Sequence, residues 1–191
     1  SEMCIRDSLI PIQKLTQLSL LNLSSFDFRI LTVANLFLAF SSVIFILKSF
    51  VNVRGHLKLG DSIVPLIIVS PSWNYLSWGF QFGFIATIFL TSLVIYQLTK
   101  SPIRDKSVFE SFIAFAPLAL LAFAGVHGSI ASVILALSIA TDLIRNHKVT
   151  RRFNQKMSGV ILLGLAPNVL VWITWNPSCL LYTSPSPRDR G

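Results

Sequence analysis

The residues best suited to chemistry lie in one polar stretch between apolar runs, residues 54–81. Its first part reads Arg54-Gly55-His56-Leu57-Lys58-Leu59-Gly60-Asp61. Arg54 or Lys58 would suit a phosphate, and Asp61 and His56 add groups that can bind hydroxyls. A solvated loop with no ligand is the simpler interpretation of the same residues.

The second part of the stretch reads Trp73-Asn74-Tyr75-Leu76-Ser77-Trp78-Gly79-Phe80-Gln81. On a helix, Asn74, Trp78 and Gln81 share one face, because they stand at i, i+4 and i+7. Amides within a membrane helix are costly unless they face the bundle or a water-filled cavity. This face therefore suits a hydroxyl-rich or phosphate-bearing group, or else it is an aromatic belt with a helix–helix hydrogen bond.

The elements that position these residues are apolar helices. A helix needs roughly 20 apolar residues to cross a membrane, and five runs fit. They are residues 30–47, 75–98, 108–125, 129–144 and 158–175. Residues 63–69 are apolar but too short to span, so they suit a re-entrant or interfacial segment. We expect an all-α transmembrane bundle of about five spans.

Composition supports a membrane class over a nucleic-acid-binding one. The chain has a formal net charge of +8, yet 53% of its residues are hydrophobic and only 13% are charged. A basic soluble domain would need far more charge on its surface. We expect the lipid bilayer as partner and no nucleic acid. No P-loop, dinucleotide fingerprint, HExxH or CxxC motif is present, so no nucleotide or metal site follows from the sequence.

Small residues and prolines refine this prediction. Gly125 and Gly128 permit a tight reversal, so the third and fourth spans should form an antiparallel hairpin. Gly128 and Ser132 form a small-xxx-small pair suited to close packing. Pro117 and Pro167 lie inside the third and fifth spans and are candidate kinks.

Charge sets the expected orientation. Under the five-span prediction, the basic loops 99–107 and 145–157 share one side, which the positive-inside rule places in the cytoplasm. Residues 51–74 are then outside. We expect an integral membrane protein of the bacterial inner membrane.

Both ends of the chain resemble translated sequencing adapter. Residues 1–7 can be encoded as TCG GAG ATG TGT ATA AGA GAC. The opposite strand of that DNA, in another frame, encodes Cys-Leu-Leu-Tyr-Thr-Ser-Pro, which is residues 179–185. We therefore expect residues 1–8 and 179–191 to be adapter-derived, and 9–178 to be a fragment of one membrane domain. Cys4 and Cys179 fall in these ends, so they predict no disulfide.

Gly60-Asp61, the apolar run and the segment 73–81 together resemble a pattern in bacterial polytopic proteins that are distantly similar to the C-type glycosyltransferase superfamily. In that pattern, roughly W-E-N-L-L-W-G-F-Q opens a span. Here Trp73-Asn74 replaces W-E-N, so the carboxylate is missing. The resemblance implies sugar transfer from a polyprenyl-phosphate donor at the outer membrane face, with a divalent metal as a further implication.

The resemblance carries over Asp61, Asn74, Trp78 and Gln81 as lining of a donor or acceptor site. The superfamily's catalytic acid usually lies in an earlier loop, so the catalytic residues are unknown here. Two alternatives stay open: a transporter or flippase for a lipid-linked or small polar solute, and a membrane scaffold without a ligand. Broken helices would favour the transporter.

Overall fold

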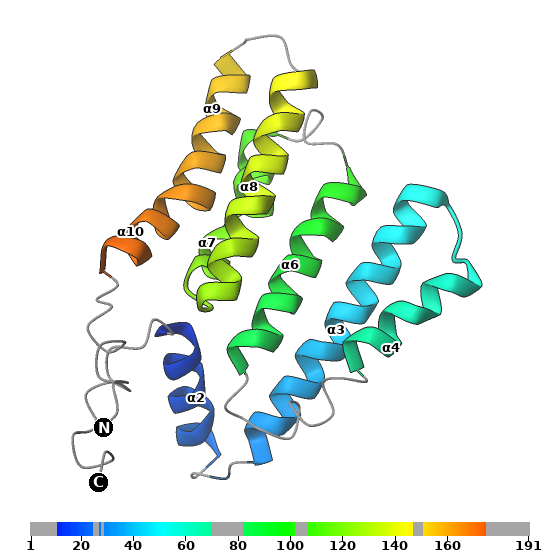
Figure 1. Ribbon diagram of the computed structural model, residues 1–191, viewed down its shortest axis with the longest axis vertical. Coiled ribbons are helices and arrows are strands. Elements are labelled where there is room, and N and C mark those ends of the chain that lie inside the picture. The colour runs from blue at the N-terminus through cyan, green and yellow to red at the C-terminus, as the bar shows by residue number, and fades with distance from the viewer. Residues whose placement is uncertain are drawn as a thin grey trace, which may run out of the picture.

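The computed structural model of the chain describes residues 11–24, 27, 29–69, 82–101, 107–146 and 151–174 (Figure 1). Every element within these ranges is helical, which confirms the predicted all-α class. The helices are α2 (Pro11–Leu23), α3 (Arg29–Arg54), η1 (Leu59–Ser62), α4 (Ile63–Val69), α6 (Phe82–Lys100), α7 (Val108–Ala122), α8 (Val126–Asn146), α9 (Arg151–Val160), the π-helical turn η3 (Ile161–Leu165) and α10 (Ala166–Thr174). The adapter-like ends and segment 73–81 lie outside the described residues.

Four helical stretches among these residues are long and apolar enough to cross a membrane. Three are α3, α6 and α8, and the fourth runs through α9, η3 and α10 from Gln155 to Ile173. The first span is longer than predicted, because α3 continues past residue 47 to Arg54. By contrast α7 has 15 residues, about 23 Å at 1.5 Å per residue, which is less than the roughly 30 Å of a hydrocarbon core.

Helices α3 and α6 run parallel to each other (Figure 1). Ala39 of α3 packs with Ile85 of α6. Further along both helices, the ring of Phe45 lies 5.3 Å from that of Tyr96, between ring centroids. The contacts advance in the same direction on both helices, which only a parallel pair allows.

The parallel pair exists because the chain turns back between the two helices. After Arg54, η1 and α4 pack back along α3 and end at Val69, and the described chain resumes with α6 at Phe82. Together η1 and α4 make a short apolar helix of Leu59–Ile68. The predicted short apolar segment is therefore a helix that reverses the chain beside α3 (Figure 1).

This arrangement corrects the predicted sidedness. The start of α6 meets the α7–α8 turn, where the Phe84 and His127 rings lie edge to face at 5.9 Å. The far end of α6, at Lys100, therefore lies with the end of α8 at Arg145, and parallel α3 brings Arg54 there too (Figure 1). We call this the basic end, defined by Arg54, Lys58, Lys100 and Arg145. Sequence reasoning had placed residues 51–58 on the opposite side because it counted the 63–69 run as part of a loop.

The apolar core lies where α6, α7, α8 and η3 meet. Its fully buried members include Val94, Phe115, Leu118 and Ile139. The predicted α7–α8 hairpin is confirmed, and Gly125 has φ +116° at its turn, a conformation that favours glycine. A Cβ on Gly128 would lie 2.3 Å from the Leu121 carbonyl oxygen, so the two helices approach as closely as the small residues predicted.

The start of α7 carries two reciprocal capping hydrogen bonds between Ser107 and Glu110. The backbone N–H of Glu110 donates to the Ser107 hydroxyl at 3.1 Å, and the Ser107 N–H donates to the Glu110 carboxylate at 2.8 Å. This capping box satisfies two N–H groups that a helix start otherwise leaves free. It fixes the point where the chain re-enters the bundle at the basic end.

Candidate functional site

Three of the predicted site residues, Arg54, His56 and Asp61, lie in the turn between α3 and η1. Gly55 ends α3 with φ +80°, and its N–H donates to the Val51 carbonyl oxygen at 2.7 Å. Glycine suits this left-handed cap because it carries no Cβ. The sequence Arg54-Gly55 therefore stops the helix and turns the chain back towards the membrane.

Asp61 is buried in this turn, with 6% of its surface exposed. One carboxylate oxygen accepts from the Arg54 guanidinium at 3.1 Å, and the other accepts from the Lys58 backbone N–H at 2.9 Å. The hydrogen bond from the Lys58 N–H holds the pKa of the Asp61 carboxyl below its ordinary value. Burial raises this pKa, and the nearby Arg54 guanidinium lowers it further. Both oxygens are engaged, so the carboxylate closes the turn.

Arg54 is held from two directions. Besides Asp61, its guanidinium lies over the Phe50 ring at 4.8 Å from the ring centroid, a favourable cation–π geometry. His56 and Lys58 are exposed. The observed geometry is that of a charge-paired hairpin turn, in which Arg54 and Asp61 fix each other and Lys58 points a cation outward.

The remaining predicted site residues, Asn74, Trp78 and Gln81, lie outside the described residues. Phe82 follows Gln81 directly and begins α6 at the end of the bundle opposite Lys100. Asp61 lies at the other end, in the turn that follows the last residue of α3, Arg54. The structure thus brings Arg54 and Asp61 together and does not bring the start of α6 near them.

A second polar site, which sequence reasoning missed, joins α7, α8 and α10. Asn168 is 3% exposed, and its carbonyl oxygen accepts from the Ser129 hydroxyl at 2.6 Å. Its amide nitrogen donates to the Gly164 carbonyl at 2.6 Å and to the Ser132 hydroxyl at 3.1 Å. The Ser132 hydroxyl in turn reaches the Leu118 carbonyl of α7 at 2.8 Å. Three buried polar side chains, Ser129, Ser132 and Asn168, are therefore hydrogen-bonded inside an apolar bundle.

Trp172 connects this network to the surface of the bundle. Its indole N–H donates to the Ser129 hydroxyl at 3.2 Å, while 54% of the residue is exposed. The hydrogen bonds run in one direction, from Trp172 through Ser129, Asn168 and Ser132 to the backbone of α7. Such chains polarise one another and are strong in a low-dielectric setting.

The network lies beside a break in the candidate membrane span Gln155–Ile173. In η3, the Ala166 N–H bonds to the Ile161 carbonyl, five residues back, and Pro167 follows with no N–H to donate. Such π-helical turns are rare and occur often at functional sites. The candidate kink at Pro167 is thus associated with a π turn, which directs the Gly164 carbonyl towards Asn168 and Ser132.

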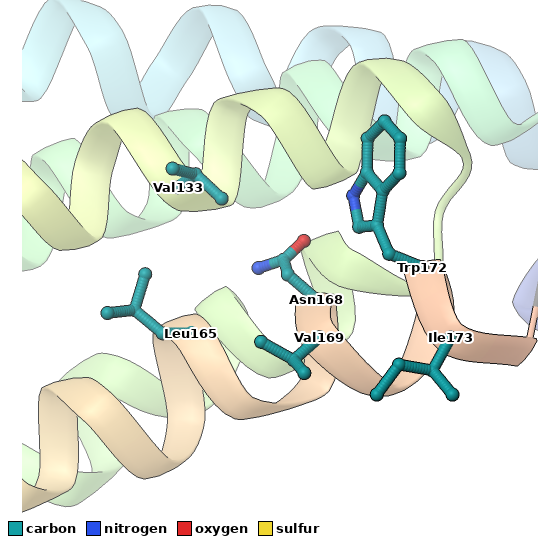
Figure 2. A pocket seen from close by; sticks show the side chains of 6 residues that line it. All are labelled: Val133, Leu165, Asn168, Val169, Trp172 and Ile173. Atoms are coloured by element: carbon teal, nitrogen blue, oxygen red, sulfur yellow. The ribbon is translucent and has the colours of Figure 1, made fainter.

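A groove of about 470 Å³ opens beside the network, between α8 and α10 (Figure 2). Figure 2 shows the Asn168 amide directed towards α8 and the Trp172 ring on the other side of Asn168 from Leu165. The lining residues are Val133, Leu165, Asn168, Val169, Trp172 and Ile173. The groove is therefore apolar except at Asn168 and Trp172, and its volume lies within the range of small-molecule sites.

Metal binding finds no support in the described part of the chain. No three His, Cys, Asp or Glu side chains there lie close enough to hold an ion. The nearest approach to a charged centre is the Arg54–Asp61 pair, whose carboxylate is already occupied. The divalent metal implied by the family resemblance therefore has no site among these residues.

The fold and the two polar sites define a membrane-associated helical bundle with one basic end and one buried amide network. Comparison with protein-family models, with curated proteins and with solved structures found no match for this chain. Its class therefore rests on the helices themselves.

Proposed function

We propose that the chain is part of an integral-membrane, glycosyltransferase-like protein of the bacterial inner membrane that uses a polyprenyl-phosphate-linked sugar at the outer face. The observation that carries the proposal is the α8–α10 groove, which offers an apolar surface for an isoprenoid chain, with Asn168 and Trp172 as polar groups in its lining. The resemblance of residues 60–81 to the C-type superfamily supplies the reaction class.

The position of the groove supports an outer-face substrate. Asn168 to Ile173 lie near the end of α10, far from Arg151 and Arg145 (Figure 1). If the basic end faces the cytoplasm, as the positive-inside rule requires, the groove opens in the outer half of the bilayer. Phe82, which follows the 73–81 segment, begins α6 in the same half.

The chain's own part in the reaction is binding and orientation. Val133, Leu165 and Val169 would contact the isoprenoid chain, and Trp172 would lie near its polar end. The acceptor hydroxyl would lose its proton to a carboxylate supplied from outside residues 9–178, as the resemblance implies. Arg54 and Lys58 lie at the basic end, so on this proposal they do not hold the donor phosphate.

The experiment is photo-crosslinking of the intact protein with a diazirine-bearing polyprenyl phosphate, followed by peptide mapping. We expect labelled peptides from Val133 and Val169, and we expect V133W to suppress them because the indole fills the groove. The matched control is I134W, since Ile134 is 58% exposed and does not line the groove. Equal labelling in V133W and I134W, or labelling only elsewhere, would contradict the proposal.

A transporter or flippase for a lipid-linked solute is the second candidate, favoured by the π turn before Pro167. Interrupted helices let a membrane bundle open on alternate sides around a central site. The two candidates separate in liposomes that contain the purified intact protein. Movement of a fluorescent polyprenyl-phosphate sugar between leaflets without a new glycosidic bond supports the transporter, whereas bond formation supports the enzyme.

A further inference from the structure

The parallel packing of α3 and α6 has a consequence for the surface of the bundle. It moves the α3–η1 turn to the same end as the α6–α7 and α8–α9 connections (Figure 1). Arg54, Lys58, Lys100 and Arg145 are all exposed there.

The described acids of this end are Asp61 in the α3–η1 turn, Glu110 at the start of α7 and Asp142 near the end of α8. The Asp61 carboxylate accepts hydrogen bonds from the Arg54 guanidinium and the Lys58 backbone N–H. It therefore pairs with Arg54 and with no other described cation of this end. Among the described residues, no acid forms an ion pair with Lys58, Lys100 or Arg145. These three side chains therefore present open positive charge at the level where the apolar helices end.

The opposite end of the bundle carries almost no net charge. Its described charged groups are Asp27 and Arg29 at the start of α3, and the Arg29 N–H donates to the Asp27 carboxylate at 2.9 Å. The α7–α8 turn there contains His127 and two glycines. The asymmetry therefore belongs to the three-dimensional arrangement, because Arg54 and Lys58 join the other basic segments only in the folded chain.

We propose that the basic end is a docking surface for anionic phospholipid headgroups, with Lys58, Lys100 and Arg145 as its contact residues. Lys100 and Arg145 lie in the last turns of α6 and α8, and Lys58 follows the end of α3. At such positions the stem of a long cation covers apolar surface and its charge reaches headgroup level. The Arg54–Asp61 pair and the Phe50 ring hold the α3–η1 turn, so Lys58 is presented from a fixed hairpin. Anionic lipid is favoured over nucleic acid because the surface is continuous with helices that are long and apolar enough to cross a membrane.

The size of the effect follows from the electrostatics of membrane surfaces. Each Lys or Arg near an anionic surface contributes about 1 kcal/mol, which corresponds to about fivefold in affinity. Replacing all three contact residues should therefore weaken binding roughly a hundredfold. The attraction should also fall as salt shortens the Debye length below about 8 Å.

The test is native mass spectrometry of the detergent-solubilised full chain, titrated with phosphatidylglycerol or with phosphatidylcholine of the same acyl chains. We expect tighter binding of phosphatidylglycerol, reduced about fivefold in each of K58Q, K100Q and R145Q. The matched control is R29Q, which removes an exposed cation from the opposite end and should leave lipid preference unchanged.

Three outcomes would overturn the proposal. One is equal binding of the two lipids by the wild-type chain, a result that needs no variant. Another is an R29Q loss as large as that of K58Q or R145Q. The third is a preference for RNA over phosphatidylglycerol when both are offered, which would assign the surface to nucleic acid.

Discussion

Asn168 connects three helices in the interior of the bundle. It links α10 to α8 through Ser129 and Ser132, and through Ser132 to the α7 backbone. Because lipid and apolar side chains cannot replace these partners, each lost bond leaves a buried donor or acceptor unsatisfied. The amide therefore selects one register for three helices.

Truncating this amide should destabilise the bundle without changing its charge. We expect N168A to lower the free energy of unfolding by about 1–3 kcal/mol, because Ser129 and Ser132 lose their partner. Thermal unfolding in detergent, followed by circular dichroism, measures the loss. The control is S138A, since the exposed Ser138 hydroxyl bonds only within its own helix, and equal losses in both variants would show that the network contributes nothing specific.

Asp61 makes the hairpin turn sensitive to acid. Its pKa is lowered in the folded chain, so the carboxylate contributes stability above the unfolded pKa of about 3.9. That stability is lost as pH falls below about 4 through the folded pKa. We expect protease cleavage between residues 54 and 61 of the wild-type protein to rise as pH falls below about 4, towards the level that D61N shows at pH 7.

The D61N variant provides the control for this titration. It should be cleaved more readily at pH 7 than the wild type, with little further change on acidification. A wild-type chain whose cleavage in this turn stays at its pH 7 level through the whole acid titration would contradict the assigned role of Asp61.

At the scale of elements, small residues set how closely the helices approach. A Cβ on Gly128 would meet the Leu121 carbonyl oxygen at 2.3 Å, and one on Gly164 would meet the Ala136 Cβ at 2.7 Å. Both glycines flank the Asn168 network, at the α7–α8 and η3–α8 contacts. The hydrogen bonds are short because the backbones are close.

Adding a methyl group at the α7–α8 contact should therefore separate the hairpin. We expect G128A to cost about 1–3 kcal/mol of unfolding free energy, because the clash is with backbone and cannot be relieved by a rotamer change. The matched control is G60A, where no atom lies within 4 Å of the added Cβ and φ is not positive. Equal stability of the two variants, measured by thermal unfolding, would refute this account of the packing.

At the scale of the whole molecule, chain direction decides which residues share a membrane face. Five alternating spans would place His56 and His127 on the same side, whereas the parallel α3–α6 pair places them at opposite ends. The two exposed histidines are therefore a matched pair of reporters. With the positive-inside rule, His56 should be cytoplasmic and His127 outside.

Cysteine labelling separates the two topologies. In a chain with Cys4 and Cys179 replaced by serine, an impermeant maleimide added to intact cells should label H127C and should not label H56C. In inverted vesicles the pattern should reverse. Labelling of both cysteines from the same side would contradict the arrangement of α3 and α6.

Several features of the fold were predictable from local sequence. Apolar runs gave the helices, Gly125 and Gly128 gave the α7–α8 hairpin, and Glu110 marks the capped start of α7. These features depend on residues a few positions apart, whose preferences act within one helix or turn. Of the predicted site, Asp61 and Arg54 do lie together, while Asn74, Trp78 and Gln81 remain predictions outside the described residues.

The Asn168 network had only a weak sequence signal, namely an asparagine after a proline inside an apolar run. Its partners Ser129 and Ser132 lie 39 and 36 residues away in the chain, and either serine could have bonded to its own helix. Local preference cannot select among such partners. Their pairing follows from the close approach of α8 to η3 at Gly164.

The sequence by itself determined that this chain forms apolar helices with basic connections, because composition and periodicity act locally. Only the tertiary structure decided that α3 and α6 run in the same direction, that the basic segments share one end, and that a buried amide lies beside an apolar groove. The physical reason is that a seven-residue apolar run is compatible with two arrangements. It can form part of a loop, or it can form a helix that packs against α3 and reverses the direction of the chain. Packing against α3 and the Arg54–Asp61 pair settle that choice.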